Sequence, residues 1–267
     1  MPKVELAGTE LHYERAGSGE PLLLIQGMSA THVTWGRPFL AELEPSFECI
    51  VFDNRGMGLS GRAELPFTIA DLAADTAALL DALELETAHV VGISMGGMIA
   101  QELALAHPER IRTLTIGCSY CGGPEGTLMV PEDLQLLGTA YASGEPEQDF
   151  RAMWEINLSP GFREDDSRFA AFAEMGSQLP APQPVVLQQM RACGAHDTHG
   201  RLGRISLPTM VIHGDADRLL GYGNGREIAA AIPGSRLETL EGAGHMFWWE
   251  RPQRSAELIR EHALAPV

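Results

Sequence analysis

Residues 89–100 read HVVGISMGGMIA and place one serine among three glycines, between a strand-like run and an apolar helical pattern. A chain that turns from strand to helix within one residue forces that residue into a strained backbone conformation, and residues two positions away must then be small. Gly92 and Gly96 occupy these two positions. The sequence therefore predicts that Ser94 lies on a sharp turn at the edge of a sheet, at the N-terminus of a helix that begins near Met95.

Short apolar runs recur along the chain and alternate with helical patterns. The predicted strands are a hairpin over residues 3–15 and runs at 22–25, 49–52, 89–93, 113–116, 209–213 and 236–240. Helices are expected over 68–85, where Thr68 and Asp71 fit a capping box, over 95–106, and after Pro252. This alternation predicts an α/β fold with a mostly parallel sheet of eight strands.

The strand rhythm stops between residues 123 and 204. This region contains helix-like segments at 132–142, 147–157, 166–177 and 184–193, and no convincing strand. We expect residues 1–122 and 205–267 to form the core domain and residues 123–204 to form a helical cap, inserted between strands 6 and 7. Helical insertions over the carboxyl edge of a sheet often control ligand access, although a purely structural insertion is the alternative.

The overall charge and the cysteine content exclude several classes of protein. A net charge of −17 repels phosphate backbones and anionic lipids, so nucleic acid and membrane surfaces are poor partners. Four cysteines are few for a disulfide scaffold, and Cys118 and Cys121 are expected to be small buried thiols rather than a redox or zinc motif. No apolar N-terminal segment suggests a signal peptide, so a cytoplasmic protein is expected.

A serine hydroxyl becomes a good nucleophile only when a base takes its proton. Of the nine histidines, His245 follows the glycine-containing segment Glu241–Gly244 just beyond the last predicted strand, where the sites of α/β proteins gather. His213 ends a strand and is expected mainly to pack, with a place in the lining of the site as the alternative. His262 is expected on the surface of the last helix. His245 is therefore the predicted base.

The base in turn needs a carboxylate that fixes its tautomer. Asp215 and Asp217 both follow the strand at 209–213, and either residue could serve. Asp217 is farther along the loop and better able to reach a histidine, whereas Asp215 is better placed to stabilise the turn. The resulting chain order is serine, aspartate, histidine.

These motifs together resemble the α/β-hydrolase fold family over essentially the whole chain. The resemblance rests on Gln26-Gly27, the loop Asp53-x-Arg55-Gly56-x-Gly58-x-Ser60, Gly92-x-Ser94-x-Gly96-Gly97, Gly214-x-x-Asp217 and Gly244-His245. It implies a triad of Ser94, Asp217 and His245, with Asp217 favoured as the last residue of its motif. It also implies an oxyanion hole made by the backbone N–H groups of Met28 and Met95. The serine sets the chain apart from relatives that use an aspartate nucleophile.

One position departs from the family pattern, since Gln26 stands where the family usually has histidine before glycine. A backbone donor does not depend on that side chain, and Gln26 could hydrogen-bond either a substrate or the loop. An apolar substrate pocket is expected, and the candidates to line it are Met28, Trp35, Met95, Trp154, Phe247 and Trp248. The candidate substrate-binding residues are Gln26, Trp35, Trp154, Phe247 and Trp248. Ordinary core packing is the alternative for the apolar and aromatic side chains.

The sequence thus predicts a serine hydrolase of a fairly hydrophobic small-molecule ester, lactone or thioester. The resemblance implies neither a metal nor an organic cofactor. Three alternatives stay open: an enol-lactone hydrolase, a cofactor-free haloperoxidase or perhydrolase, and a ligand-binding or receptor-like protein of the same fold. A homodimer is left open as well.

Overall fold

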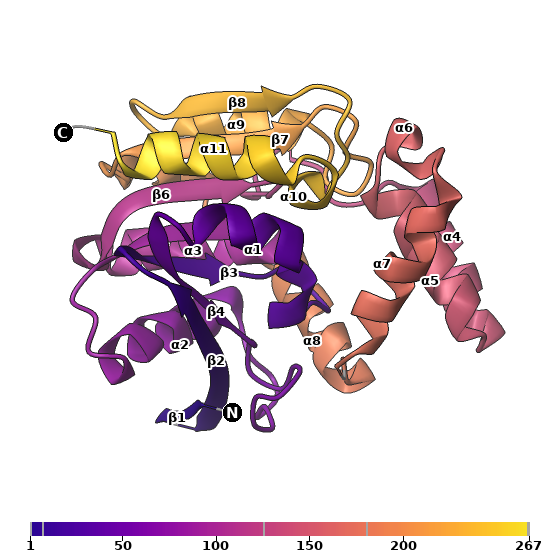
Figure 1. The fold of residues 1–267 in the computed structure, drawn as a ribbon, viewed down its shortest axis with the longest axis horizontal. Coiled ribbons are helices and arrows are strands. Elements are labelled where there is room, and N and C mark those ends of the chain that lie inside the picture. The colour runs from indigo at the N-terminus through magenta and orange to yellow at the C-terminus, as the bar shows by residue number, and fades with distance from the viewer. Residues whose placement is uncertain (1, 7, 125, 180, 266–267) are drawn as a thin grey trace.

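The computed structural model of the protein describes residues 2–6, 8–124, 126–179 and 181–265. Within them, eight strands form one sheet in the order β1-β2-β4-β3-β5-β6-β7-β8 (Figure 1). β1 and β2 pair antiparallel, β2 and β4 also pair antiparallel, and all other neighbours are parallel. The strands are β1 Lys3–Leu6, β2 Thr9–Gly17, β3 Glu20–Ile25, β4 Phe47–Phe52, β5 Ala88–Ile93, β6 Ile111–Gly117, β7 Thr209–Gly214 and β8 Arg236–Leu240. The predicted fold class is confirmed.

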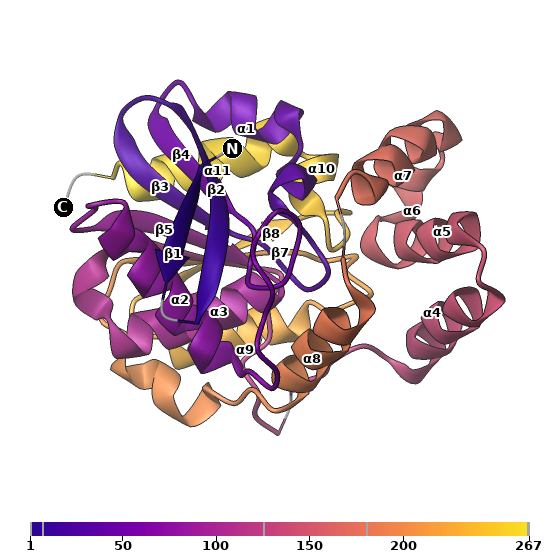
Figure 2. The same ribbon diagram turned by 90° about the horizontal axis from the view of Figure 1, so that it is seen from below.

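Helices cover both faces of the sheet (Figure 2). One face carries α2 (Ile69–Ala82), α3 (Met95–Ala106) and α9 (Gly223–Ala231), and the other carries α1 (Arg37–Leu43), α10 (Phe247–Glu250) and α11 (Pro252–Ala263). Two short 3-10 helices, η1 (His32–Trp35) and η2 (Pro108–Arg110), lie in the connections. The central strands are buried on both sides, which explains why they read as continuous apolar runs.

Strand β3 shows how each run serves two cores. Leu23 and Ile25 pack with α2 and α3 in one buried cluster, whereas Leu22 and Leu24 pack with α1 and α11 in the other. Successive side chains of a strand point to opposite faces, so one four-residue run supplies both layers.

Helix α2 begins where the sequence predicts. The Thr68 hydroxyl accepts from the Asp71 N–H (3.2 Å), and the Asp71 carboxylate accepts from the Thr68 N–H (2.7 Å). Both bonds of the capping box are therefore present.

Between β6 and β7 the described chain is helical and contains no strand. The elements are α4 (Pro131–Ser143), α5 (Pro146–Asn157), α6 (Pro160–Arg163), η3 (Asp166–Arg168), α7 (Phe169–Ser177), α8 (Gln183–Gly194) and η4 (His199–Arg204). Helices α4 to α7 extend from one side of the molecule, whereas α8 lies closer to the sheet (Figures 1 and 2). Val185 of α8 belongs to the core cluster of α2, and Gln188 donates to the Phe67 carbonyl (2.6 Å). The division at residues 123 and 204 stays a prediction.

One expectation about the last helix is wrong. His262 is buried, and its Nε2 lies 3.1 Å from the carbonyl oxygen of Leu114. Because α11 packs against β6, a histidine on its inner face reaches a backbone carbonyl in the middle of that strand. A polar residue near a helix C-terminus does not by itself reveal which face is buried.

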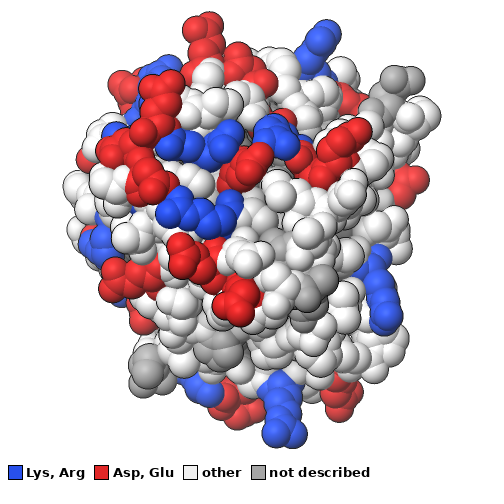
Figure 3. Space-filling view, turned by 90° about the vertical axis from the view of Figure 1, so that its right-hand side faces the viewer, with Lys and Arg blue, Asp and Glu red and all other residues white. Residues whose placement is uncertain are grey.

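The outer surface carries charges of both signs. On the face beside α4 to α7, acidic and basic side chains are interspersed in the upper half, and a largely uncharged area lies below them (Figure 3). No helix in the described ranges is long and apolar enough to cross a membrane.

Candidate active site

The turn between β5 and α3 holds Ser94 in a strained conformation, with φ 55° and ψ −124°. A Cβ on Gly92 would lie 2.2 Å from the Gly96 carbonyl oxygen, and a Cβ on Gly96 would lie 2.0 Å from the Ile25 carbonyl oxygen. Both obstacles are backbone atoms, which cannot swing aside. The two glycines are therefore required by the close approach of α3 to β5 and β3.

The strained serine is held by its own backbone. The Ser94 N–H donates to the Gly117 carbonyl at the end of β6 (2.9 Å), and the Ser94 carbonyl accepts from the Ser119 hydroxyl (2.8 Å). Ser94 is partly accessible, whereas its neighbours Ile93 and Met95 are buried. The turn thus presents one hydroxyl at the carboxyl edge of the sheet.

The loop after β3 lies directly against this serine. A Cβ on Gly27 would be 2.9 Å from the Ser94 Cβ, so only glycine allows the contact. The N–H groups of Met28 and Met95 donate no hydrogen bond to any other described residue. Met95 opens α3, where free N–H groups and the helix dipole favour negative charge. The two predicted oxyanion donors are therefore free to donate hydrogen bonds to an oxyanion.

Asp217 and His245 form a buried pair beside this turn. Asp217 Oδ2 lies 2.8 Å from His245 Nδ1, and Asp217 Oδ1 accepts from the N–H groups of Leu219 (2.8 Å) and Leu220 (2.9 Å). Burial alone would raise the pKa of the Asp217 carboxyl, but the charge of His245 and hydrogen bonds from both neighbouring histidines hold that pKa well below its usual range. Asp215 instead accepts from the Gly242 N–H (2.6 Å) and stabilises the turn.

A second histidine contacts the same carboxylate. Nε2 of the fully buried His213 lies 3.1 Å from Asp217 Oδ2 and 2.7 Å from the Leu220 carbonyl oxygen. From the sequence, His213 is expected mainly to pack, and its contact with the carboxylate is not predicted. Its position four residues before the aspartate, at the end of β7, is the only signal in the sequence for this contact.

Cys118 lies at the junction of the three predicted catalytic residues. Its sulfur, a carboxylate oxygen of Asp217 and a ring nitrogen of His245 all lie within 4.8 Å of one another. Burial, and then the charge of Asp217, raise the pKa of its thiol well above the usual range, while the backbone of Ser94 acts in the opposite direction. No direct hydrogen bond joins the side chains of Ser94 and His245 across the described residues; such bonds often tighten only when substrate binds.

The loop that carries His245 is tied to the helical insertion. The carboxylate of Glu250, in α10, accepts from the Ser159 N–H (2.7 Å), the Ser159 hydroxyl (2.6 Å) and the Gly244 N–H (3.0 Å). A Cβ on Gly244 would lie 2.8 Å from the Asn157 carbonyl oxygen, and the Met246 N–H donates to that same oxygen (3.0 Å). Nothing in the sequence pattern singled out Glu250 or Ser159.

A second contact joins the insertion to the loop after β3. Gln189 of α8 is fully buried, and its side-chain oxygen accepts from the Ser29 N–H (2.9 Å). Ser29 has a positive φ of 58° and follows Met28 directly. The conformation of this loop thus depends on a side chain from the far end of the insertion.

The candidate substrate-binding residues are all buried. Trp35, Trp154, Phe247 and Trp248 belong to one apolar cluster on the α1–α11 side of the sheet. Gln26 donates nothing to the described residues through Nε2, while its Oε1 accepts from the Gly27 N–H (3.1 Å). Their assignment to substrate binding stays a prediction.

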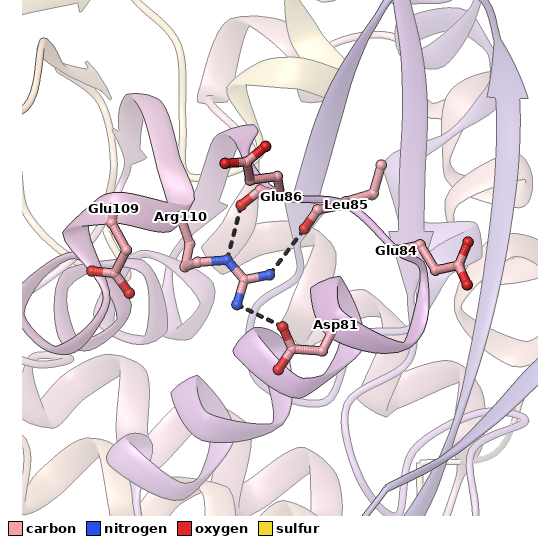
Figure 4. A pocket seen from close by; sticks show the side chains of 6 residues that line it. All are labelled: Asp81, Glu84, Leu85, Glu86, Glu109 and Arg110. Carbon is pink, nitrogen blue, oxygen red and sulfur yellow. Dashed lines mark hydrogen bonds and ion pairs between the residues drawn. The ribbon is translucent and has the colours of Figure 1, made fainter.

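A surface depression lies far from this site, at the opposite edge of the sheet. Its residues surround Arg110, which precedes β6 (Figure 4). The guanidinium donates to the carbonyl oxygens of Glu86 and Leu85 (2.9 Å each) and pairs with Asp81 (2.7 Å). Arg110 therefore joins the end of α2 to the start of β5 and has a structural role.

Comparisons with known proteins point in one direction. A family model described as alpha/beta hydrolase fold matches residues 20–252. RutD of Azorhizobium caulinodans, named a carbamate hydrolase, is 32% identical over 264 residues that cover 97% of each chain. BpoC of Mycobacterium tuberculosis, named a non-heme bromoperoxidase, is 33% identical over 91% of this chain and 93% of its own. The crystal structure of the enol-lactonase from Burkholderia xenovorans LB400 is similar with a TM-score of 0.83, 26% identity and coverage of 98% and 99%.

Proposed function

The chain belongs to the α/β-hydrolase fold family, and on that premise we propose that it is a serine hydrolase of a carboxylic ester, lactone or thioester. The observation that carries the proposal is the combination of a strained, partly accessible Ser94 at the N-terminus of α3 with the buried Asp217–His245 pair next to it. A non-glycine residue in a strained conformation costs stability. A serine that is kept there, between two required glycines, therefore supports a functional rather than a structural role.

In the proposed reaction, Ser94 Oγ attacks the substrate carbonyl while His245 Nε2 takes the hydroxyl proton. Asp217 holds His245 through the Nδ1–H and stabilises the imidazolium that forms. The free N–H groups of Met28 and Met95 stabilise the oxyanion. The carbon–oxygen (or carbon–sulfur) bond to the leaving group breaks as His245 returns the proton, and water activated by His245 then releases the acid from the acyl-enzyme.

A fairly hydrophobic, uncharged substrate fits the surroundings best. The buried aromatic cluster around Trp154 and Phe247 borders the His245 loop, and the largely uncharged area in Figure 3 lies on the side of the insertion. Four unpaired, buried cysteines support the proposal of a cytoplasmic, reducing setting. The α4–α7 segment would act as a cap over the site.

Labelling with a fluorophosphonate, followed by intact-mass measurement, tests the activated nucleophile. We expect one adduct on the wild type, none on Ser94→Ala, and an unchanged adduct on Ser177→Ala, which removes an exposed hydroxyl elsewhere. We also expect Ser94→Ala to lower kcat on p-nitrophenyl acetate by at least about 10³-fold. An adduct that persists on Ser94→Ala, or none on folded wild type, would overturn the proposal.

Two related activities use the same residues. The first is lactone hydrolysis, which the similarity of the chain to the enol-lactonase structure suggests. A screen of lactones beside open-chain esters of equal size separates lactonase from esterase activity. A perhydrolase would convert a carboxylic acid and hydrogen peroxide into a peracid and water, which the similarity to BpoC makes worth testing with acetate and peroxide. A binding protein of this fold would turn over none of these compounds.

A further inference from the structure

A second cluster of ionisable side chains lies at the start of the chain, formed by β2 and the 3-10 helix η1. His12 and Glu14 are two residues apart on β2 and therefore point to the same face of the strand, and His32 of η1 lies opposite them. Glu14 Oε1 is 3.7 Å from His12 Nε2 and 3.5 Å from His32 Nε2. The three potential ligand atoms all lie within 4.8 Å of one another. Neither the triad nor the predicted oxyanion donors belong to this cluster.

Both imidazole rings are oriented from behind by an oxygen atom. His12 Nδ1 lies 3.0 Å from the Pro2 carbonyl oxygen, which can only accept, so Nδ1 carries the proton. His32 Nδ1 lies 3.0 Å from a carboxylate oxygen of the fully buried Asp53. In the neutral rings Nε2 then has a free lone pair, and both lone pairs are within reach of Glu14. Metal-binding histidines are held in this way, with the second ring nitrogen bonded to a carbonyl or carboxylate.

The Nε2 atom of His12 supplies an independent observation. His12 is fully buried, and this atom has no hydrogen-bond partner among the residues that the structure describes. A buried polar atom without a partner is costly, and native proteins rarely keep one without a reason. The backbone of His12 is meanwhile fixed, since its N–H donates to the Ser60 hydroxyl (2.9 Å) and its carbonyl accepts from the Asp53 N–H (3.0 Å).

We propose that His12, Glu14 and His32 form a binding site for a divalent transition metal ion, with Zn²⁺ as its best-fitting occupant. Two imidazole nitrogens and one carboxylate oxygen are a known donor set for zinc and leave one position open to water or another ligand. In a tetrahedral site with zinc–nitrogen bonds of about 2.0–2.1 Å, neighbouring ligand atoms lie about 3.3–3.4 Å apart. The distances from Glu14 exceed this by a few tenths of an ångström, which the half-exposed Glu14 side chain can supply.

The site joins two separate segments of the chain, β2 and η1. His32 follows the loop of residues 26–31, and β2 belongs to the antiparallel edge of the sheet. An ion held between them would stabilise the native state, because the unfolded chain does not preassemble the three ligands. The proposal is independent of the hydrolytic chemistry at Ser94.

Isothermal titration of the metal-free protein with zinc chloride tests the site, with the unfolding temperature measured alongside. We expect one equivalent of zinc per chain and a higher unfolding temperature with zinc than with EDTA. Cobalt(II) gives a second measurement, since ions bound by nitrogen and oxygen in a four- or five-coordinate site absorb visible light, and added zinc should remove that absorption. Magnesium should not bind, because it disfavours imidazole ligands.

Two variants remove one ligand each and are chosen to disturb the fold as little as the site allows. Glu14→Gln changes a half-exposed side chain, and His32→Asn keeps an N–H near the position of Nδ1 for Asp53 while it removes Nε2. We expect each to weaken zinc binding by at least about tenfold. Glu5→Gln on the neighbouring strand β1 is the matched control and should bind zinc like the wild type.

The variants also locate the ion. Cys118, Asp217 and His245 are a second group whose ligand atoms lie close together. Zinc at that group would still bind to Glu14→Gln and His32→Asn with unchanged affinity and stoichiometry, and this result would overturn the proposal. An absence of zinc and cobalt binding to the folded wild type would overturn it as well.

Discussion

Asp217 receives hydrogen bonds on both carboxylate oxygens, two from backbone N–H groups and two from histidine rings. Only the bond to His245 belongs to the predicted triad. His213 shares its single Nε2 proton between Leu220 and Asp217, so it fixes both the loop and the carboxylate. We interpret His213 as a positioning residue that acts on His245 through Asp217.

Replacement of His213 therefore tests this role. His213→Leu removes the donor, whereas His213→Gln keeps an N–H near the position of Nε2. A hydrogen bond to a charged group contributes about 1.5–3 kcal/mol, so we expect His213→Leu to lower kcat on p-nitrophenyl acetate by roughly tenfold or more with little change in KM. His213→Gln should recover most of the rate. Equal losses in both variants, at equal thermal stability, would contradict the positioning role.

The carboxyl group of Asp217 also links stability to pH. Its pKa is lowered in the folded protein, so the unfolded chain binds more protons in acid, and the free energy of unfolding falls as pH decreases. The contribution is fully present above the unfolded pKa of about 3.9 and is lost progressively as pH falls toward the folded pKa. Urea unfolding at pH 5, 4 and 3 should show a smaller loss in Asp217→Asn than in the wild type. A loss of the same size in both would rule out this contribution.

At the residue scale, the sequence was informative where local geometry demands a particular residue type. Ser94 and its two glycines form one continuous motif, and the preference for Asp217 over Asp215 agrees with the contacts of the two carboxylates. The surface placement of His262 was wrong, because the environment of a histidine depends on groups that the fold brings near it, and its partner lies 148 positions away. The contact of His213 with Asp217 is local in sequence, but it depends on the conformation of the loop after β7, which the sequence pattern does not reveal.

The first turn of α3 is the element on which the site depends most. Gly96 lies against the end of β3, and the obstacle to any Cβ there is the carbonyl group of Ile25. Since neither backbone can move without disturbing the sheet, Gly96→Ala would separate α3 from β3 and shift Ser94.

We expect Gly96→Ala to lower the free energy of unfolding by about 3 kcal/mol or more, or to prevent folding. Gly138→Ala is the matched control, because a Cβ at this exposed position of α4 meets nothing within 4 Å. It should raise stability by roughly 0.5–1 kcal/mol, since alanine is the better helix former. Urea unfolding measures both changes. A Gly96→Ala protein as stable as the wild type would show that the turn can relax.

Helices that are short or rich in glycine are not predicted by the sequence pattern. α1 has seven residues, too few to show a helical period, and α9 begins with Gly-Asn-Gly, which lowers helix propensity. The structure explains one of these glycines: a Cβ on Gly225 would lie 2.5 Å from Nδ1 of His213. Close packing beside Asp217 thus overrides the local preference, and the sequence alone does not reveal it.

On the scale of the whole molecule, the helical insertion is attached both to the loop of His245 and to the loop of Met28. Glu250 joins residues 157–159 to the His245 loop, and Gln189 joins α8 to the loop of Met28. The break in strand rhythm predicted that an insertion exists. It did not predict these attachments, because an amphipathic pattern tells which side of a helix is buried but not what it is buried against.

Loss of the Glu250 attachment should loosen the insertion without unfolding the core. Glu250→Gln replaces one carboxylate oxygen with an NH2 group. This group cannot accept the hydrogen bonds that the Ser159 and Gly244 donors make to Glu250. We expect faster amide hydrogen exchange at residues 157–159 and 244–246, a lower kcat, and little change in the exchange of β3 and β5. Glu257→Gln on the exposed side of α11 is the control. Unchanged exchange at 157–159 would show that the Asn157 carbonyl contact suffices.

The bond between Gln189 and Ser29 has a consequence for any attempt to exchange the insertion between relatives. A graft that replaces residues 123–178 leaves α8 in place and keeps the support of the loop that precedes η1. A graft that also replaces α8 imports a foreign residue at position 189 and leaves the Ser29 N–H without its acceptor. In this chain the segment that can be exchanged without loss of this hydrogen bond therefore ends before α8 rather than at the end of the helical region.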